Sequence, residues 1–129
     1  MHEYLQSIGH DCCRYSQNGE YEWIQHAPIA IWVGVNQAQV DAIAAGEIDA
    51  ACFNPSERAV LRFTEQVVNR VKADEEVVSE VAKFLSPREI VELILAIGYY
   101  MTMVRLTETT RTDLDKSAGT AIIDSVSRR

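Results

Sequence analysis

The feature that most constrains the fold is a helix-start signal that occurs twice. Asn54-Pro55-Ser56-Glu57 and Ser86-Pro87-Arg88-Glu89 each place a capping residue before a proline, with a glutamate three positions after the cap. Proline suits the first helical position because the N–H that it lacks would have no partner there. The glutamate can accept from the backbone N–H of the capping residue, which completes a capping box. The two signals predict two helices with defined first residues.

Apolar residues recur at helical spacing after both signals, and we expect the second helix to run to about Leu106. We expect a shorter helix capped by Asp74, and another that Asn36 opens with Gln39. Gly34 and Gly46 are predicted helix stops on either side of the latter. An N-terminal helix is expected over residues 1–13. The expected apolar face of the first helix is Val60, Phe63, Val67, Val68 and Val71. That of the second helix is Ile90, Leu93, Ile94, Ile97 and Met101. That of the Asp74 helix is Val77, Val78, Val81, Phe84 and Leu85. Strand signals are weak, so the sequence predicts an all-α fold.

Length and charge narrow the class of protein. The chain has 129 residues, which predicts a single domain over residues 1–129 with a polar tail at 116–129. Twelve basic against nineteen acidic residues give a net charge of −7, which disfavours nucleic-acid binding as the main role. No signal peptide is visible, and the apolar stretch Ile90–Val104 is interrupted by Glu92 and too short to span a bilayer. We therefore expect a cytoplasmic protein that binds neither nucleic acid nor membrane.

The segment that carries chemistry is Tyr21-Glu22-Trp23-Ile24-Gln25-His26. Glu22 and His26 are four residues apart, so on a helix they share a face and can meet. A carboxylate beside an imidazole favours the imidazolium and holds the ring in one orientation, which suits a general acid or base. Tyr21 and Trp23 could wall a partly dry pocket. The alternative interpretation is an ion pair that only joins helices.

Two other groups of residues could carry chemistry. A hydroxyl of Tyr99-Tyr100 could line a pocket next to His26, although paired aromatics in an apolar helix are usually core. His10-Asp11-Cys12-Cys13 could bind a soft metal, but a helix end with partly buried thiols is the favoured interpretation. The three cysteines, Cys12, Cys13 and Cys52, form a poor disulfide framework. We predict no metal and no cofactor.

Several motifs occur in a fixed order along the chain: Tyr21-Glu22-Trp23-x-x-His26, Ile29-Ala30, Gly34-Val35, Ala42-Ile43, Pro55-x-Glu57-Arg58-Ala59-Val60-Leu61, Glu89-Ile90-Val91-Glu92-Leu93-Ile94 and Gly98-Tyr99-Tyr100-Met101. Together they resemble the carboxymuconolactone decarboxylase family of the AhpD-like superfamily, over about residues 20–115. The resemblance implies an AhpD-like helical bundle that assembles as a trimer or hexamer.

The resemblance also implies two chemistries. AhpD-like alkylhydroperoxidases use Cys-x-x-Cys followed by a histidine; here His26 matches that histidine, but Glu22 stands at the second cysteine and the first falls near Gly19. A carboxylate cannot perform thiol–disulfide exchange, so the dithiol mechanism is disfavoured. Decarboxylase-type members work without those cysteines and use the histidine to move a proton. In the peroxidase branch a glutamate on the preceding helix completes a proton relay, and Glu3 is the nearest candidate.

We therefore expect a decarboxylase-like lyase acting on a small organic acid or lactone, with His26 as acid/base and Glu22 as its orienting partner. Tyr21, Trp23, Tyr99 and Tyr100 are the expected substrate-binding residues. Arg105 is a candidate source of positive charge for an anionic substrate, although a solvated arginine is the favoured interpretation. The alternatives are an AhpD-like thiol peroxidase using Cys12 or Cys13, with peroxiredoxin-type activity, and a non-catalytic oligomeric scaffold.

Packing predictions follow from the two long helices. Because the Asp74 helix between them lets the chain return, we expect them to pack as an antiparallel pair. The second helix has apolar residues off its main stripe, at Val91, Leu95, Tyr99 and Val104. A helix that is apolar all round is buried on all sides, and a chain of this size has little interior to bury it. We expect a homo-oligomer that uses this helix.

Overall fold

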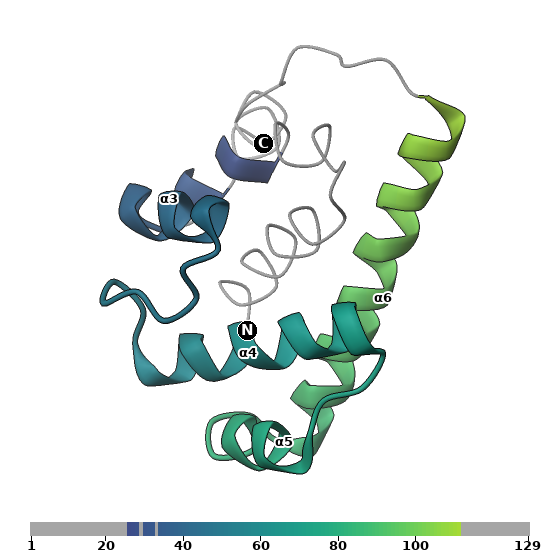
Figure 1. Cartoon of the computed structure of the whole chain (residues 1–129). Coiled ribbons are helices and arrows are strands. Elements are labelled where there is room, and N and C mark those ends of the chain that lie inside the picture. The colour runs from purple at the N-terminus through teal and green to yellow at the C-terminus, as the bar shows by residue number, and fades with distance from the viewer. Residues whose placement is uncertain (1–25, 29, 33, 112–129) are drawn as a thin grey trace, which may run out of the picture.

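The computed structural model describes residues 26–28, 30–32 and 34–111, and all its regular structure in these ranges is helical. Residues 26–28 and 30–32 are helical and precede four further helices. These are α3 (Gln37–Ala45), α4 (Pro55–Arg70), α5 (Glu75–Val81) and α6 (Pro87–Thr110), as Figure 1 shows. The all-α prediction is confirmed for the described part of the chain.

The helix starts lie where the sequence predicts them. Asn36, Asn54 and Ser86 each accept a hydrogen bond from the backbone N–H three residues on, and the side chain at that third position accepts from the N–H of the cap. At α6 the Ser86 backbone N–H and hydroxyl both donate to Glu89, which lowers the pKa of that carboxyl. Local sequence alone therefore fixes where α3, α4 and α6 begin.

Two helix ends use glycine in the left-handed conformation. Gly46 ends α3 at φ 79°, and the N–H groups of Gly46 and Glu47 donate back to Ile43 and Ala42. Gly34 has φ 109°, and Gly34 and Val35 donate to Ile31 and Ala30 in the same pattern. Both ends are Schellman motifs, which satisfy carbonyls that the last helical turn would leave without partners. The predicted stops at both glycines are confirmed.

The first turns of α3 and α4 are joined side chain to side chain. Gln39 belongs to the capping box of α3, and Glu57 belongs to that of α4. The Nε2 of Gln39 donates to Oε2 of Glu57 at 3.2 Å and to the carbonyl of Cys52 at 3.3 Å. The two capping boxes are therefore one hydrogen-bonded network, which we call the Gln39–Glu57 link.

The described core contains two clusters that meet on α4. The larger cluster joins α4, α5 and α6, and the smaller joins α3, the loop before α4, and Leu61 of α4. Buried members of the larger cluster are Val60, Phe63, Val81, Leu85, Leu93 and Ile97. Buried members of the smaller are Ala42, Ile43, Phe53 and Leu61. Burying these side chains is the main stabilising contribution visible in the described residues.

The predicted antiparallel pairing of the long helices is wrong. α4 and α6 share the larger cluster, but Figure 1 shows α6 rising across the C-terminal end of α4 rather than lying alongside it. α5 lies next to α4 instead. A short connection brings two helices into contact without fixing their crossing, which depends on how their side-chain ridges fit.

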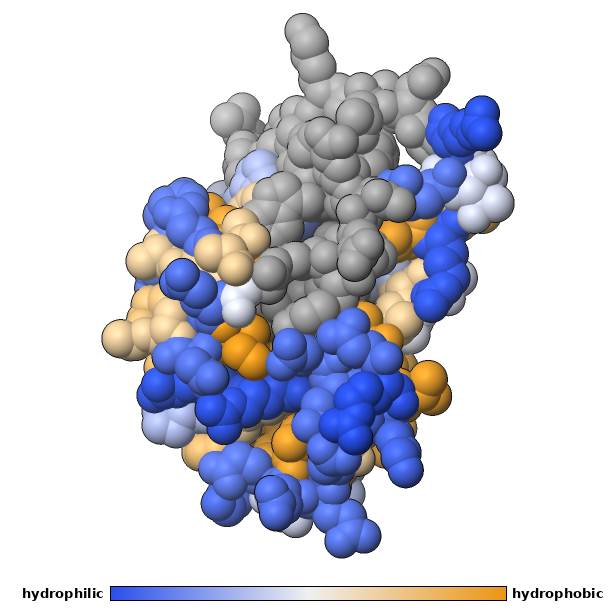
Figure 2. All heavy atoms as spheres, viewed as in Figure 1, coloured by the Kyte–Doolittle hydropathy of each residue, from blue (hydrophilic) through white to orange (hydrophobic). Residues whose placement is uncertain are grey.

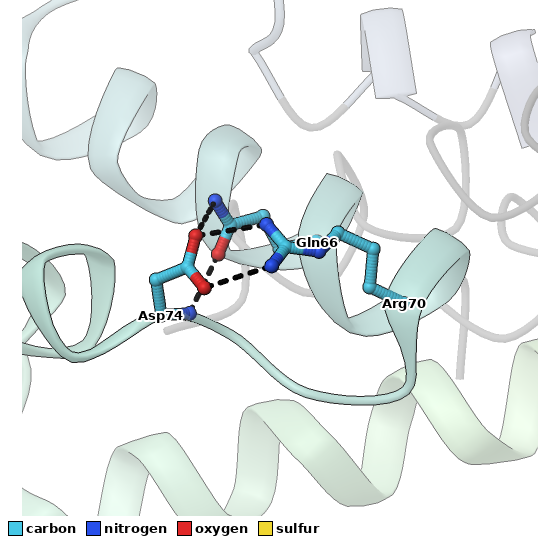
Figure 3. Close-up of polar contacts among 3 residues, drawn as sticks. All are labelled: Gln66, Arg70 and Asp74. Atoms are coloured by element: carbon cyan, nitrogen blue, oxygen red, sulfur yellow. Dashed lines mark hydrogen bonds and ion pairs between the residues drawn. The ribbon is translucent and has the colours of Figure 1, made fainter.

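The prediction that Asp74 caps the next helix is only half right. Asp74 is the N-cap residue of α5, but its side chain makes no capping bond. The carboxylate instead accepts from both terminal nitrogens of Arg70, at 2.8 and 2.9 Å, and from Gln66, whose Oε1 accepts the Asp74 N–H (Figure 3). The hydrogen bonds from Arg70 lower the pKa of Asp74. The residue therefore ties the end of α4 to the start of α5.

All three predicted apolar faces differ in part from the structure, and on α6 the exception is Ile94, which is 44% exposed. Val71 ends α4 in the left-handed conformation at φ 68° and is 90% exposed, so it leaves the apolar face of that helix. α5 ends at Val81, and Phe84 lies in the following turn with 43% of its surface exposed. Val78 is also exposed, whereas Val81 and Leu85 are buried. The 3.6-residue period applies only within a helix, so residues beyond the helix end need not lie on the predicted apolar face.

α6 is longer and more exposed than an ordinary core helix. It runs four residues beyond the predicted end at Leu106, to Thr110. Only 22% of its most apolar window is buried, and Val91, Leu95 and Tyr99 are each more than half exposed. Figure 2 shows a largely hydrophilic face over α4 and α5, with hydrophobic side chains emerging along α6. Within the described ranges α6, with 24 residues, is the one helix long and apolar enough to cross a membrane, which corrects the expectation that the stretch Ile90–Val104 is too short for this. Core helices of other proteins meet the same criterion, so it does not identify a membrane segment.

The C-terminal half of α6 bonds its polar side chains to its own backbone. Thr102 donates to the carbonyl of Gly98 at 2.9 Å, and Thr107 donates to those of Met103 and Val104. Thr110 and Arg105 donate to carbonyls one turn back in the same way. These bonds give the polar side chains partners within their own helix.

Candidate functional site

His26 lies against an aromatic residue of α6. The rings of His26 and Tyr100 have centroids 5.4 Å apart and planes 85° apart, which is an edge-to-face contact. Both side chains are half-buried. The contact joins the helical stretch at residues 26–28 to the middle of the last described helix, across 74 positions of sequence. It brings the candidate acid/base residue next to one of the predicted substrate-binding tyrosines.

The core holds Tyr100 in place. Its ring packs against the larger cluster, so the surface that it offers to His26 is set by α4, α5 and α6 together. Tyr99 makes a second edge-to-face contact with Tyr100, with ring centroids 5.6 Å apart and planes 77° apart. Tyr99 itself is 62% exposed. Edge-to-face pairs add modestly to the stability from burial alone, and they fix ring orientation. The three rings form one chain from His26 to the surface of α6.

Several predicted site residues lie outside the described residues. These are the orienting partner Glu22, the wall residues Tyr21 and Trp23, the relay candidate Glu3, and the thiols Cys12 and Cys13. Their roles stay predictions. Of the six predicted catalytic and substrate-binding residues, the structure brings together His26, Tyr99 and Tyr100.

The remaining candidates have other partners or other surroundings. Arg105 is exposed, and its guanidinium donates to the carbonyl of Met101 at 2.9 Å, so it lies on the solvent side of α6. Cys52 is half-buried as a free thiol, 3.7 Å from the carbonyl oxygen of Ala38. Over the described ranges no three His, Cys, Asp or Glu side chains are grouped so that they could hold a metal ion.

Among the described arginines and lysines, Arg58 is half-buried and the others are exposed. No arginine or lysine in the described ranges is buried. Several pair with carboxylates at the surface, as Arg70 does with Asp74 and Arg88 with Glu92. A charged substrate group buried near Tyr100 would need a partner of opposite charge. The described side chains of the site are the rings of His26, Tyr99 and Tyr100.

One buried polar residue was missed by the sequence analysis. Thr64 of α4 has no exposed surface, and its Oγ1 has no hydrogen-bond partner. It is the one buried polar or charged side chain among the described residues. A signal was present, since position 64 falls between the apolar positions Val60, Leu61 and Val67, Val68, on the inward face of the helix.

Comparisons with known proteins add no relative to the geometry of His26 and Tyr100. The chain was compared with protein-family models, with curated proteins and with solved structures, and none of the three comparisons finds a match.

Proposed function

We propose that this chain is a carboxymuconolactone decarboxylase-like enzyme in which His26 acts as general acid and base on a small organic acid or lactone. The observation that carries the proposal is the contact between His26 and Tyr100. It supports a site because it combines a titratable ring, half-buried, with an aromatic surface that the core orients. The AhpD-like bundle and the family assignment are part of the same proposal.

The chemistry asks for one well-placed proton carrier. When a lactone acid loses CO2, the bond from carbon to the carboxylate breaks and its electron pair passes into the conjugated lactone as an enolate. The His26 imidazolium then delivers a proton to that carbon and becomes neutral imidazole, which solvent protonates again. Histidine titrates near neutral pH, so both forms are accessible during turnover. No metal or redox cofactor is needed for this balance.

The other predicted residues have supporting roles in the proposal. Glu22, four residues before His26, accepts from one ring nitrogen and leaves the other for substrate. Tyr100 is a positioning residue that orients the imidazole through its ring. Tyr21, Trp23 and Tyr99 supply apolar wall. The small-molecule substrate, a cytoplasmic location, and the absence of nucleic-acid and membrane partners belong to the proposal as well.

We propose further that the enzyme is a homo-oligomer, a trimer or hexamer, that uses α6. The exposed apolar residues Val91, Leu95 and Tyr99 are spaced four apart and form one stripe on that helix. Contiguous exposed apolar surface of this kind is typical of interfaces. Tyr99 contacts Tyr100, so an interface at this stripe would adjoin the site.

The test is CO2 release from carboxymuconolactone, the compound in the family's name. His26→Ala should lower kcat roughly a hundred- to ten-thousand-fold, the usual contribution of one acid/base group, while far-ultraviolet circular dichroism stays unchanged. His10→Ala removes a different imidazole of the chain and is the matched control. Tyr100→Phe keeps the ring contact and should keep most activity, whereas Tyr100→Leu should lose it.

Two results would overturn the proposal. One is that His26→Ala lowers the melting temperature and leaves CO2 release intact, which would make the residue structural. The other is that the wild-type protein releases no CO2 and instead consumes alkyl hydroperoxide with a dithiol donor. The latter would favour the thiol peroxidase.

A further inference from the structure

We propose that α6 pairs with α6 of a second copy of this chain, antiparallel and around a twofold axis beside Gly98. The inference rests on the homo-oligomer that the proposed function includes, and it names the symmetry and the crossing point of the contact. In a hexamer such an axis relates two trimers. The contact also covers Tyr99, the outermost of the three rings that begin at His26.

Gly98 is the starting observation because packing within the described protein does not require a glycine there. The residue lies in the middle of α6 and is exposed, and a Cβ added to it meets nothing within 4 Å. Glycine destabilises the interior of a helix relative to alanine. A glycine at such a position is useful where a second backbone approaches closely. The open space beside Gly98 therefore fits a helix from outside the chain.

The surface around Gly98 suits a contact from which water is excluded. The Oγ1 of Thr102 donates to the carbonyl of Gly98 at 2.9 Å, so this carbonyl keeps a hydrogen bond when the face is covered. No charged residue occurs in the sequence between Glu92 and Arg105. Covering this part of the helix therefore buries no charge.

The exposed apolar residues of α6 lie beside Gly98 on one side of the helix. Val91, Leu95, Tyr99 and Leu106 are each more than half exposed. At about 100° per residue they fall within a sector of about 80°, and Gly98 borders that sector. One face of α6 thus carries both the apolar side chains and the space for a close approach.

This face is arranged so that it can pair with itself. Leu95 and Thr102 lie at equal distances in sequence from the midpoint between residues 98 and 99. An antiparallel partner that crosses at this midpoint brings Leu95 of one protomer opposite Thr102 of its partner. It also lays Tyr99 of each protomer beside Gly98 of the other, so a large ring meets a position without a side chain. A twofold contact requires a surface that complements itself in this way.

The area of the face is close to what a stable pair needs. Covering its four exposed apolar side chains in two copies removes roughly 700 Å² of apolar surface from water. Apolar atoms make up about 65% of homodimer interfaces, so the whole contact is roughly 1,100 Å². A specific interface needs about 1,000 Å². The area suffices only if the two helices approach closely, which makes the space at Gly98 decisive.

Molar mass measured by sedimentation equilibrium tests the crossing point. Gly98→Leu fills the space that the partner helix needs, so it should weaken association roughly tenfold to a hundredfold and halve the molar mass. Gly98→Ala should weaken association less. Glu108→Leu adds similar bulk on the side of α6 opposite Tyr99 and is the matched control, with an unchanged molar mass expected. Circular dichroism should show no loss of helix in Gly98→Leu, because leucine favours a helix more than glycine does.

Disulfide cross-linking tests the direction of the pair, in a background with Cys12, Cys13 and Cys52 replaced by serine. In an antiparallel pair, Leu95→Cys alone or Thr102→Cys alone places the two thiols about 10 Å apart along the helix, too far to bond. Leu95→Cys/Thr102→Cys brings the two positions opposite each other and should form covalent dimers on mild air oxidation. Within one chain the two positions are also about 10 Å apart, so they should not bond to each other.

Several results would overturn the proposal. Gly98→Leu could keep the wild-type molar mass, Glu108→Leu could lower it as much, or a single cysteine variant could cross-link as well as the double variant. A monomeric wild type would also overturn it, and would leave the face to residues 112–129 or to a different protein.

The failures of the two proposals are distinguishable because molar mass does not depend on turnover. A wild-type molar mass in Gly98→Leu, together with loss of CO2 release in His26→Ala, would overturn the α6 pair alone. A halved molar mass in Gly98→Leu, together with full CO2 release in His26→Ala, would overturn the acid/base proposal and leave the pair.

Discussion

Replacing Gln39 by glutamate should destabilise the protein although it keeps a favourable capping residue. Glutamine and glutamate both suit the third position of a capping box, so α3 itself is expected to tolerate the change. The Gln39–Glu57 link is not, because a carboxylate has no N–H to donate to Oε2 of Glu57 or to the carbonyl of Cys52. Two carboxylates would then face each other between α3 and α4.

The expected loss is about 2 kcal/mol in the free energy of unfolding. A hydrogen bond to a charged acceptor contributes roughly 1.5–3 kcal/mol and a neutral one roughly 0.5–1.5 kcal/mol, and these are long and partly exposed, so the lower values apply. Like-charge repulsion adds about 1 kcal/mol in a solvated setting. The new charge gains somewhat less than that from the helix N-terminus. For a chain of this length, about 2 kcal/mol lowers the melting temperature by about 7 °C.

Urea unfolding at pH 7, followed by circular dichroism at equal protein concentrations, measures this loss. Gln37→Glu is the matched control, because Gln37 sits in the same turn and bonds only to exposed Asp41. It should change stability by less than about 0.5 kcal/mol. At about pH 3.5 the deficit of Gln39→Glu should narrow, because protonating one of the two carboxyls supplies a donor.

The double variant Gln39→Glu/Glu57→Gln provides the sharpest check. It exchanges donor and acceptor across the link, so it should recover much of the stability that Gln39→Glu loses. The reasoning is refuted if Gln39→Glu is as stable as Gln37→Glu at pH 7. It is also refuted if the double variant loses as much free energy of unfolding as the two single variants together.

Two further predictions concern surfaces. The pKa of Asp74 is lowered by its hydrogen bonds with Arg70, so the stability that this pair contributes is present above the ordinary carboxyl pKa of 3.8 and is lost as pH falls below it. Asp74→Asn should therefore be less stable than wild type at pH 7. The stabilities of the two proteins should converge as pH is lowered, in an acid titration followed by circular dichroism. Leu95→Glu places a charge on the exposed stripe of α6, and light scattering should show a smaller species with unchanged helix content, whereas an unchanged molar mass would remove the stripe from the interface.

Local sequence predicted the parts of this fold that depend on a few neighbouring residues. The caps at Asn36, Asn54 and Ser86 and the stops at Gly34 and Gly46 are of this kind, because each needs only one turn of helix. The C-terminal extension of α6 was missed because residues 107–110 are polar, and hydrophobic periodicity registers only apolar positions.

Features that depend on contacts between helices could not be predicted in this way. Asp74 has the sequence signature of a cap, but its carboxylate accepts hydrogen bonds from Arg70 and Gln66 of the preceding helix instead of capping α5. The crossing of α4 and α6 depends on how the two surfaces fit, which no single segment encodes. Of the candidate site, the spacing of Glu22 and His26 came from sequence, but the edge-to-face contact of His26 with Tyr100 depends on how two helices pack.

The threonine side chains of α6 have a consequence for any partner that covers this helix. Because the hydroxyls of Thr102 and Thr107 turn back onto the carbonyls of Gly98, Met103 and Val104, these side chains can present their methyl groups outward. When a partner covers this surface, the threonine hydroxyls keep their hydrogen bonds to the helix carbonyls, so no hydrogen bond is left unmade. Residues that a composition count scores as polar would then behave as small aliphatic groups when water is expelled, and the dry contact area available on α6 would be larger than its leucines and valines alone suggest.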